Sequence, residues 1–352
     1  MQSFLSSPIH IESTYELLRI DIDNEQTILS DKSEILVTEM TFTNCHSDSS
    51  GGAIFVISDT YMFCNFSSFS NCSSNIKGGA IYSIIPHLNF TQGCFNNCFA
   101  PYGAAIFAPD ITTNISIEGS YFDDFEEKDN STSTSVLFTS ARDIVIKSSN
   151  FTSISLTNSA AFSLQPTHWL NISHITLSNV VSKNAIASFV NIQPNSPFNY
   201  SNIINCKSDS YLITVSNYVQ SYQSVVFYKC ECTKYFYLND AKIIVENCKF
   251  DKGSSADLTD DINNVLSMNN STFSEINEND FADLETVITN GCWAHSHYKW
   301  KQPKVYVQAI VGVIIALCLV GGFVAIIVHH CLNRKKINQA TVVFVGSSKS
   351  NN

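Results

Sequence analysis

The sequence has little charge and almost no arginine. Only 14% of its 352 residues are charged, and the only arginines are Arg19, Arg142 and Arg334. The formal net charge is -11, and no stretch gathers enough basic residues to neutralise a row of phosphates. The scarcity of positive charge argues against a nucleic-acid partner.

The repeating part of the chain also lacks a helical period. Apolar and polar residues alternate in short segments such as 111–122, 143–151, 170–177 and 241–250. Alternation places successive side chains on opposite faces of a strand, whereas an amphipathic helix needs a period near 3.6. These stretches are therefore expected to be β-strands.

A secretory signal peptide is missing at the N-terminus. The first residues, MQSFLSSPIHIESTYELL, contain neither a basic segment nor an apolar run of about seven residues. Two explanations stay open. Either Met1 is not the natural start, or a later apolar segment is itself the targeting signal.

One long apolar run is present, and no charged residue occurs in it from Val305 to Val328. At about 1.5 Å of helical rise per residue, it is long enough to cross a hydrocarbon core of roughly 30 Å. Trp300 and Tyr306 on one side and Arg334-Lys335-Lys336 on the other resemble interfacial anchors. We predict one transmembrane helix over 305–328, with a buried core helix as the alternative.

Cysteines and glycosylation sequons indicate which side of the membrane the rest occupies. Ten of the 12 cysteines, Cys45 to Cys292, precede the apolar run, as does every Asn-x-Ser/Thr sequon. We therefore expect a plasma-membrane protein with an extracellular N-terminal region and a short cytoplasmic tail over 329–352. Cys331, just past the helix, is a possible acylation site. The possible N-glycosylation sites are Asn65, Asn89, Asn114, Asn130, Asn150, Asn171, Asn199 and Asn270.

A motif recurs in the first part of the chain: FTNCHSDSSGGAIF at 42–55, FSNCSSNIKGGAIY at 69–82 and FNNCFAPYGAAIF at 95–107. Its opening apolar residue recurs at intervals of 23 to 29 residues, and we call these positions the markers. The markers are Phe42, Phe69, Phe95, Phe122, Phe151, Leu177, Ile203, Phe227, Phe250 and Phe273.

A unit of about 25 residues with two or three short strands cannot close its own core, so neighbouring units must stack. We predict an all-β fold, a right-handed parallel β-helix (solenoid), over 31–285. An N-terminal cap or incomplete start occupies 1–30, and a juxtamembrane linker occupies 286–304. A β-sandwich or a propeller would also contain many short strands, but a sandwich has no reason to repeat Asn-Cys at one phase, and propeller repeats are longer.

The motif residues are expected to form ladders along the stack, with Phe inward, Asn amides stacked at a corner, and Cys at one phase of successive coils. Because adjacent coils lie about 4.8 Å apart, the ladder cysteines are either joined in disulfides or form a column of free thiols. The predicted ladder residues are Phe42, Asn44, Cys45, Phe69, Asn71, Cys72, Phe95, Asn97 and Cys98. Asn71 also begins a sequon, and an amide stacked inside a ladder could not carry a glycan.

The repeat glycines have two possible roles. Each suits either a bend with positive φ or a place where another backbone passes close by. They are Gly51, Gly52, Gly78, Gly79 and Gly103.

The Gly-Gly-Ala-Ile tetrads at 51–54 and 78–81, with the variant at 103–106, resemble the repeat of the chlamydial polymorphic membrane proteins. The preceding Phe-x-Asn resembles that family's second repeat motif. Similar repeats occur on trichomonad surface proteins, which the single predicted helix and short tail favour. The resemblance implies adhesion or host contact, and no catalytic residue carries over.

Flat, repetitive ladders offer area without a pocket, which suits binding better than turnover. We therefore predict a non-enzymatic surface glycoprotein that contacts an extracellular protein or glycan, with no cofactor and no metal. The alternatives are a membrane-tethered polysaccharide lyase or glycoside hydrolase, and an inert scaffold. For an enzyme the candidate carboxylates are Asp123, Asp124, Glu126, Glu127, Asp257, Asp260 and Asp261, although solvated loops are the simpler explanation for them.

Overall fold

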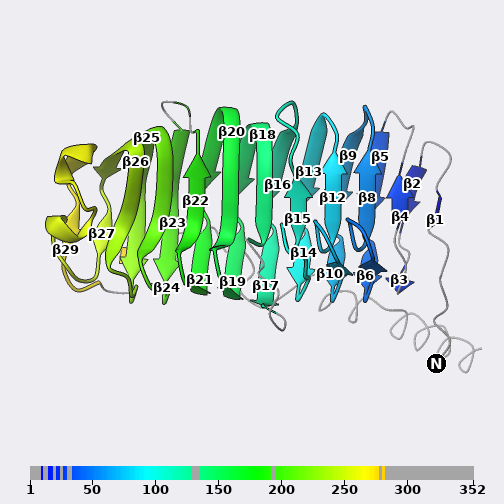
Figure 1. Ribbon diagram of the computed structural model, residues 1–352, viewed down its shortest axis with the longest axis horizontal. Coiled ribbons are helices and arrows are strands. Elements are labelled where there is room, and N and C mark those ends of the chain that lie inside the picture. The colour runs from blue at the N-terminus through cyan, green and yellow to red at the C-terminus, as the bar shows by residue number, and fades with distance from the viewer. Residues whose placement is uncertain are drawn as a thin grey trace, which may run out of the picture. The chain divides into compact units, whose positions relative to one another are not determined.

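The computed structural model is a parallel β-solenoid of right-handed type with about nine turns (Figure 1). The structure describes residues 34–127, 135–191, 193, 196–276 and 280–281, and the backbone of four short strands before residue 34. The solenoid belongs to a compact unit spanning Met1–Ser296, whereas the second unit, His297–Asn352, lies wholly outside the described residues. The predicted all-β parallel solenoid is confirmed.

The markers lie on one sheet, which we call the marker sheet. Each marker pairs in parallel with the marker of the next coil, from Phe42 with Phe69 to Phe250 with Phe273. Ile22 pairs with Phe42, so parallel pairing begins before residue 31. The strands are β3 (Asp21–Asp23), β6 (Thr41–Thr43), β10 (Ser68–Ser70), β14 (Cys94–Asn96), β17 (Tyr121–Glu126), β19 (Asn150–Leu156), β21 (Thr176–Ser182), the ends of β23 (Ser196–Ile204) and β25 (Tyr211–Tyr228), β27 (Lys249–Phe250) and β29 (Thr272–Phe273).

The segments after the glycine corners form a second sheet, the Gly-Ala-Ile sheet. In the first coils Ile54 pairs with Ile81, and Ile81 pairs with Ile106. Its strands are β1 (Ile9–His10), β4 (Thr27–Leu29), β8 (Ile54–Ile57), β12 (Ile81–Ile84), β15 (Ile106–Ala108), the first parts of β18 (Leu137–Lys147) and β20 (Ser159–Ser173), β22 (Ala185–Val190), and the first parts of β25 and β26 (Lys234–Glu246).

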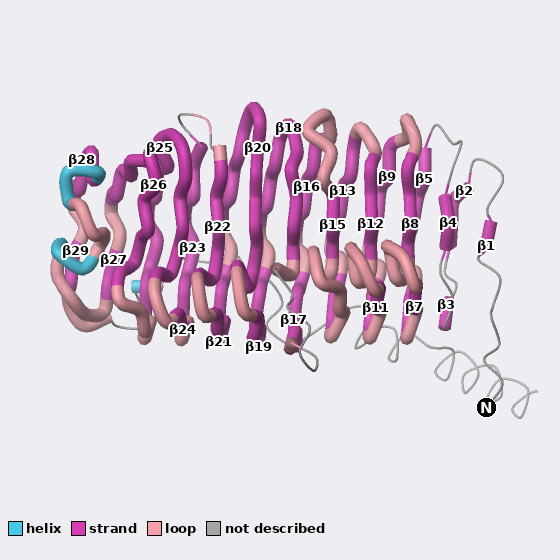
Figure 2. The backbone as a smooth tube through the Cα atoms, in the orientation of Figure 1, coloured by secondary structure: helices cyan, strands magenta, loops and turns pink. Residues whose placement is uncertain are grey.

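The third sheet precedes the markers in each coil, and we call it the groove sheet. The long strands β18, β20, β25 and β26 turn a corner and contribute to both this sheet and the Gly-Ala-Ile sheet, as the continuous strand segments in Figure 2 show. The other strands are β2 (Tyr15–Leu18), β5 (Glu34–Thr38), β9 (Tyr61–Asn65), β13 (His87–Thr91), β16 (Asn114–Glu118), the start of β23, and β28 (Val265–Asn269). Short pieces complete the coils: β7 (His46–Ser47), β11 (Ser73–Ser74), β24 (Lys207–Ser208) and two 3-10 turns, η1 (Ser255–Asp257) and η2 (Ile262–Asn264).

The core is a column of side chains between the three sheets. Alternation sends every second residue inward, so the strands β5 and β9 both alternate between buried and more exposed positions. The markers from Phe42 to Phe151 are completely buried, and their successive rings lie 4.5 to 4.9 Å apart and within 7° of parallel. Leu177 and Ile203 occupy the same position further along, so the column accepts aliphatic side chains too.

A left-handed corner precedes each marker strand, and a second one follows most of them. The residue two positions after the marker has φ between 47° and 60° in eight coils: Asn44, Asn71, Asn97, Asp124, Ser153, Asn179, Asn205 and Lys229. Asn and Asp tolerate this backbone region better than most residues, which explains why Asn recurs there. The residue three positions before the marker has φ between 46° and 60° and no common type: Glu39, Phe66, Gln92, Gly119, Ser148, His174, Tyr200, Ser224, Asn247 and Asn270.

Candidate functional site

The asparagine ladder lies at the solvent-facing corner. The Asn97 amide donates to the Asn71 side-chain oxygen at 2.8 Å, and Asn205 donates to Asn179 at 3.4 Å. Asn44 and Asn71 are exposed rather than enclosed. Asn71 is therefore both a ladder member and accessible at the surface.

The ladder cysteines Cys45, Cys72 and Cys98 are buried free thiols. The Cys98 thiol donates to the carbonyl of Phe69 in the preceding coil at 3.6 Å and to its own Asn96 carbonyl at 3.5 Å. Cys72 and Cys206 make the same pair of contacts in their own coils. Of the two alternatives for this column, the structure contains the free-thiol form, in which Cys72, Cys98 and Cys206 each bond to the backbone of two coils.

Buried cysteines, both in this ladder (Cys206) and on the groove sheet (Cys64), should resist alkylation in the folded protein. Burial raises the pKa of Cys64 and of Cys206 from the ordinary 9.0 to about 12, and the thiolate is the reactive form. We expect mass spectrometry after iodoacetamide treatment at pH 8 to find both residues unlabelled in the native chain and labelled in urea. Equal labelling in the two states would contradict the buried arrangement.

The same shift has a consequence for stability against pH. The folded state holds these protons more tightly than the unfolded state, so the contribution to stability is present in full below about pH 9. It is lost as the pH rises toward about 12.

The repeat glycines divide between the two expected roles. Gly51, Gly78 and Gly103 have φ of 71°, 66° and 61°, the left-handed region. Gly79 instead lies against a neighbouring coil, where an added Cβ would be 2.0 Å from the Ala104 carbonyl oxygen. Gly52 is placed in the same way, because a Cβ added to it would be 2.1 Å from the Gly79 carbonyl oxygen.

Several sequons coincide with a corner of the coil. Ser67, the third residue of the Asn65 sequon, is buried, accepts the Met40 N–H at 3.1 Å and donates to the Asn65 carbonyl at 3.0 Å. Ser149 occupies the same corner and makes equivalent bonds to Ser120 and Lys147 without completing a sequon. A serine at this corner therefore bridges two coils whether or not it completes a sequon.

Most of the described sequons lie on the outer side of the groove sheet, at partly exposed positions: Asn65, Asn89, Asn114, Asn171 and Asn199. Asn150 lies on the marker sheet, where its side-chain oxygen is buried without a partner, and Asn270 is exposed at a left-handed corner. Asn130 falls outside the described residues.

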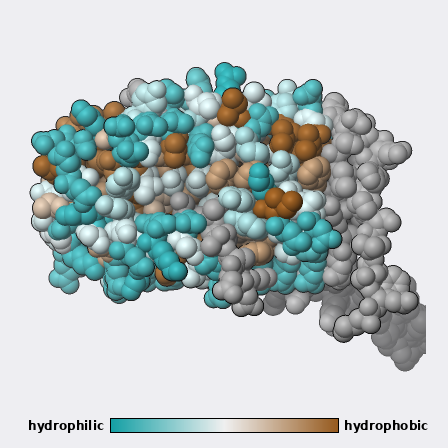
Figure 3. Space-filling view, viewed as in Figure 1, coloured by the Kyte–Doolittle hydropathy of each residue, from teal (hydrophilic) through white to brown (hydrophobic). Residues whose placement is uncertain are grey.

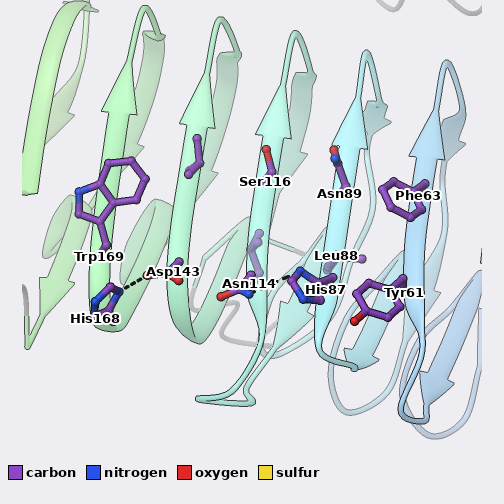
Figure 4. Close-up of a pocket in the computed structure, with 12 residues that line it drawn as sticks. Tyr61, Phe63, His87, Leu88, Asn89, Asn114, Ser116, Asp143, His168 and Trp169 are labelled. Atoms are coloured by element: carbon purple, nitrogen blue, oxygen red, sulfur yellow. Dashed lines mark hydrogen bonds and ion pairs between the residues drawn. The ribbon is translucent and has the colours of Figure 1, made fainter. Parts of the chain in front are cut away.

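The most distinctive surface feature is a groove on the outer side of the groove sheet (Figure 4). Tyr61, His87, Asn114, Asp143 and Trp169 follow one another in register across five coils. A parallel row lies beside them, formed by Phe63, Asn89, Ser116 and Val145. The groove has a volume of about 610 Å³.

One end of the groove is an aromatic wall on β9 and β13. The rings of Tyr61 and His87 are stacked, with centroids 4.6 Å apart and planes within 17°. They belong to neighbouring coils, so each ring covers part of one face of the other. The Asn114 amide lies 3.4 Å from His87 Nδ1 on the far side of this pair.

The other end is formed by a bulge in β20. The register between β18 and β20 shifts between Ala141 and Asp143, so His168 and Trp169 are both exposed beside the same coil. His168 Nδ1 is 2.6 Å from the Asp143 carboxylate, and Arg142 Nε is 3.7 Å from its other oxygen. Trp169 is 39% exposed. The sequence pattern does not mark Asp143, His168 or Trp169 as site residues. None of them belongs to a repeated motif, and the residues in register with them are of other types.

A second aromatic row lies outside the Gly-Ala-Ile sheet. Phe55, Tyr82, Phe107 and Phe138 stack in succession, with centroids 4.9 to 5.7 Å apart. Their faces cover one another, so little ring surface is free. The view in Figure 3 is mainly hydrophilic, with small, separate hydrophobic patches.

The carboxylates considered for catalysis support turns. Asp124 occupies the left-handed corner, and burial raises the pKa of its neighbour Asp123. Asp257 accepts the Ser254 N–H at 2.8 Å, and Asp261 caps η2. Asp260 accepts the Tyr211 hydroxyl at 2.7 Å, while Glu126 and Glu127 are exposed. Within the described part of the chain, no three His, Cys, Asp or Glu residues are grouped to hold a metal ion.

Comparison of the chain with family models, curated proteins and solved structures finds no match. Among the described residues, none forms a helix of the length and apolar character that a membrane span needs. The predicted helix at 305–328, the linker at 286–304, the tail at 329–352 and Cys331 lie outside those residues.

Proposed function

We propose that the chain is a non-enzymatic, single-pass surface glycoprotein that uses its β-solenoid for adhesion or cell contact. The observation that carries the proposal is the groove, in which exposed aromatic side chains and half-buried amide and carboxylate side chains line up across five coils. Its repeats resemble those of polymorphic membrane proteins and of trichomonad surface proteins. The apolar run at 305–328 supplies the membrane anchor in this proposal.

The placement of carboxylates favours binding over hydrolysis. Glycoside hydrolases place two carboxyl groups on either side of the scissile bond. Asp143 is the only carboxylate among the residues that line the groove, and it is paired with His168. A tethered glycosidase or lyase therefore has less support than a binding protein.

The exposed aromatics also favour binding over a passive scaffold. Tyr61 is 45% exposed and Trp169 is 39% exposed, and both belong to one groove. A spacer gains nothing from exposing large rings, whereas contact sites are enriched in Tyr and Trp.

The proposal is tested by expressing the full chain in cultured cells that do not contain it. We expect an antibody to the solenoid to label intact cells, an antibody to residues 338–352 to label only permeabilised cells, and N-glycosidase to lower the mass. Cells bearing the chain should adhere to a second cell layer more strongly than cells without it. Labelling of the tail on intact cells would overturn the topology, and surface expression without added adhesion would favour the scaffold.

A further inference from the structure

The groove has two aromatic ends and a polar floor. The stacked pair Tyr61 and His87 closes one end, and Trp169 stands at the other. Between them Asn114 and Asp143 lie on the floor, and Figure 4 shows Ser116 in the parallel row. His87 and Trp169 are three coil steps apart, which corresponds to about 14 Å at about 4.8 Å per coil.

We propose that this groove is a binding site for a neutral glycan chain, an assignment that rests on the proposed role of the solenoid in surface contact. Sugar rings have an apolar face that stacks on an aromatic ring and hydroxyl edges that bond to amides and carboxylates. The His87 and Trp169 side chains stand at the two ends of the floor, and the Asn114 and Asp143 side chains lie between them. A few sugar rings fit between the two ends.

The charge of the groove selects a neutral chain over an acidic one. Asp143 is held between His168 and Arg142, which offsets its charge locally. The whole chain has a formal net charge of -11, so a polyanionic glycan would be repelled at longer range. Hydroxyl groups need no counter-charge, and they can accept from an amide N–H or donate to a carboxylate.

An extended peptide fits this surface less well. Peptides that add to a sheet do so at an edge, where backbone N–H and C=O groups are unpaired. The groove instead lies over the face of the groove sheet, where β13, β16 and β18 pair with one another along their length. Side chains alone are presented there.

Glycan binding in the groove requires two of the sequons to be unglycosylated. Asn89 and Asn114 both line the groove, and a glycan attached to either would fill it. In the binding form these two asparagines are therefore unmodified, whereas Asn270, which is exposed and far along the chain, is free of this constraint.

The test uses the full chain, purified in a detergent without a sugar headgroup and immobilised. Its affinity is measured for neutral oligosaccharides built from glucose, galactose, mannose or N-acetylglucosamine, and for uronate oligosaccharides of equal length. We expect binding to at least one neutral series and weaker binding to uronates. His87→Ala and Trp169→Ala should each lower the affinity about tenfold, because each removes an aromatic ring that borders the floor of the groove.

The matched control is Tyr237→Ala, which removes a ring of similar exposure, 41%, on the Gly-Ala-Ile part of β26. It should leave the affinity unchanged. Asp143→Asn preserves the shape of the floor and should weaken binding less than either aromatic variant. Far-UV circular dichroism establishes that each variant is folded.

Three results would overturn the assignment: no neutral glycan bound, equal affinity in Trp169→Ala and the parent chain, or a glycan found by mass spectrometry on Asn89 or Asn114 of the binding-competent protein. Adhesion that persists with no glycan bound would remove this inference and leave the proposed function. Glycan binding by a chain that confers no adhesion would keep the glycan site and remove the proposed role in adhesion.

Discussion

Replacing Gly79 by alanine is expected to destabilise the solenoid by more than about 4 kcal/mol, among the largest effects of a single methyl group. The new Cβ would lie 2.0 Å from the Ala104 carbonyl oxygen and 2.6 Å from that of Phe99. Both obstructing atoms are backbone, so no side-chain rotation relieves the contact. The two coils would have to separate, which breaks the hydrogen bond from Gly79 N to Gly103 O at 3.1 Å.

The equivalent position one coil later provides the control. Ala104 already carries a Cβ there, so Ala104→Gly should cost only about 0.5–1 kcal/mol through the greater freedom of glycine in the unfolded chain. Urea unfolding of the full chain, followed by far-UV circular dichroism, measures both changes. A Gly79→Ala midpoint close to that of the parent would show that the coils are not packed at the distance described.

Replacing Phe95 by alanine is expected to lower the free energy of unfolding by about 3–5 kcal/mol. Phe95 is completely buried, and its ring stacks on Phe69 at 4.9 Å and on Phe122 at 4.8 Å. Alanine would remove both stacking contacts and leave a cavity within the column. The coils on either side cannot collapse into that cavity, because their backbones are hydrogen-bonded in register.

Two further variants separate the column from a general loss of an aromatic residue. Phe95→Leu should cost clearly less than alanine, because the chain itself places Leu177 and Ile203 at this position. Phe66→Ala, which truncates a ring that is 45% exposed, should change stability by less than about 1 kcal/mol. The same urea unfolding measurement applies, and equal losses for Phe66→Ala and Phe95→Ala would refute a buried stack.

The repeat of apolar markers in the sequence was sufficient to predict the parallel β-solenoid. All ten markers, from Phe42 to Phe273, pair in register, although their spacing varies between coils. This worked because each coil must return an apolar residue to the same inward position, and the parallel pairing tolerates insertions only at the corners.

The corner before each marker was beyond the reach of pattern analysis. Residues as different as Phe66, Gln92 and His174 adopt a left-handed backbone there. The conformation is imposed by the bonded coils and, in several coils, by a buried serine that bridges two of them, such as Ser149. No single residue type is required at the corner itself, so no motif appears.

By itself the sequence determined the period, the parallel stacking and the inward column of this protein, because those depend on which residues repeat. The groove was decided only by the tertiary structure. Tyr61, His87, Asn114, Asp143 and Trp169 share no type and are separated by whole coils, and they meet because parallel register places each one coil from the next. A bulge in β20 then exposes Trp169 beside His168. Outward side chains are free of the packing that makes the core repeat, and for that reason the groove leaves no periodic trace.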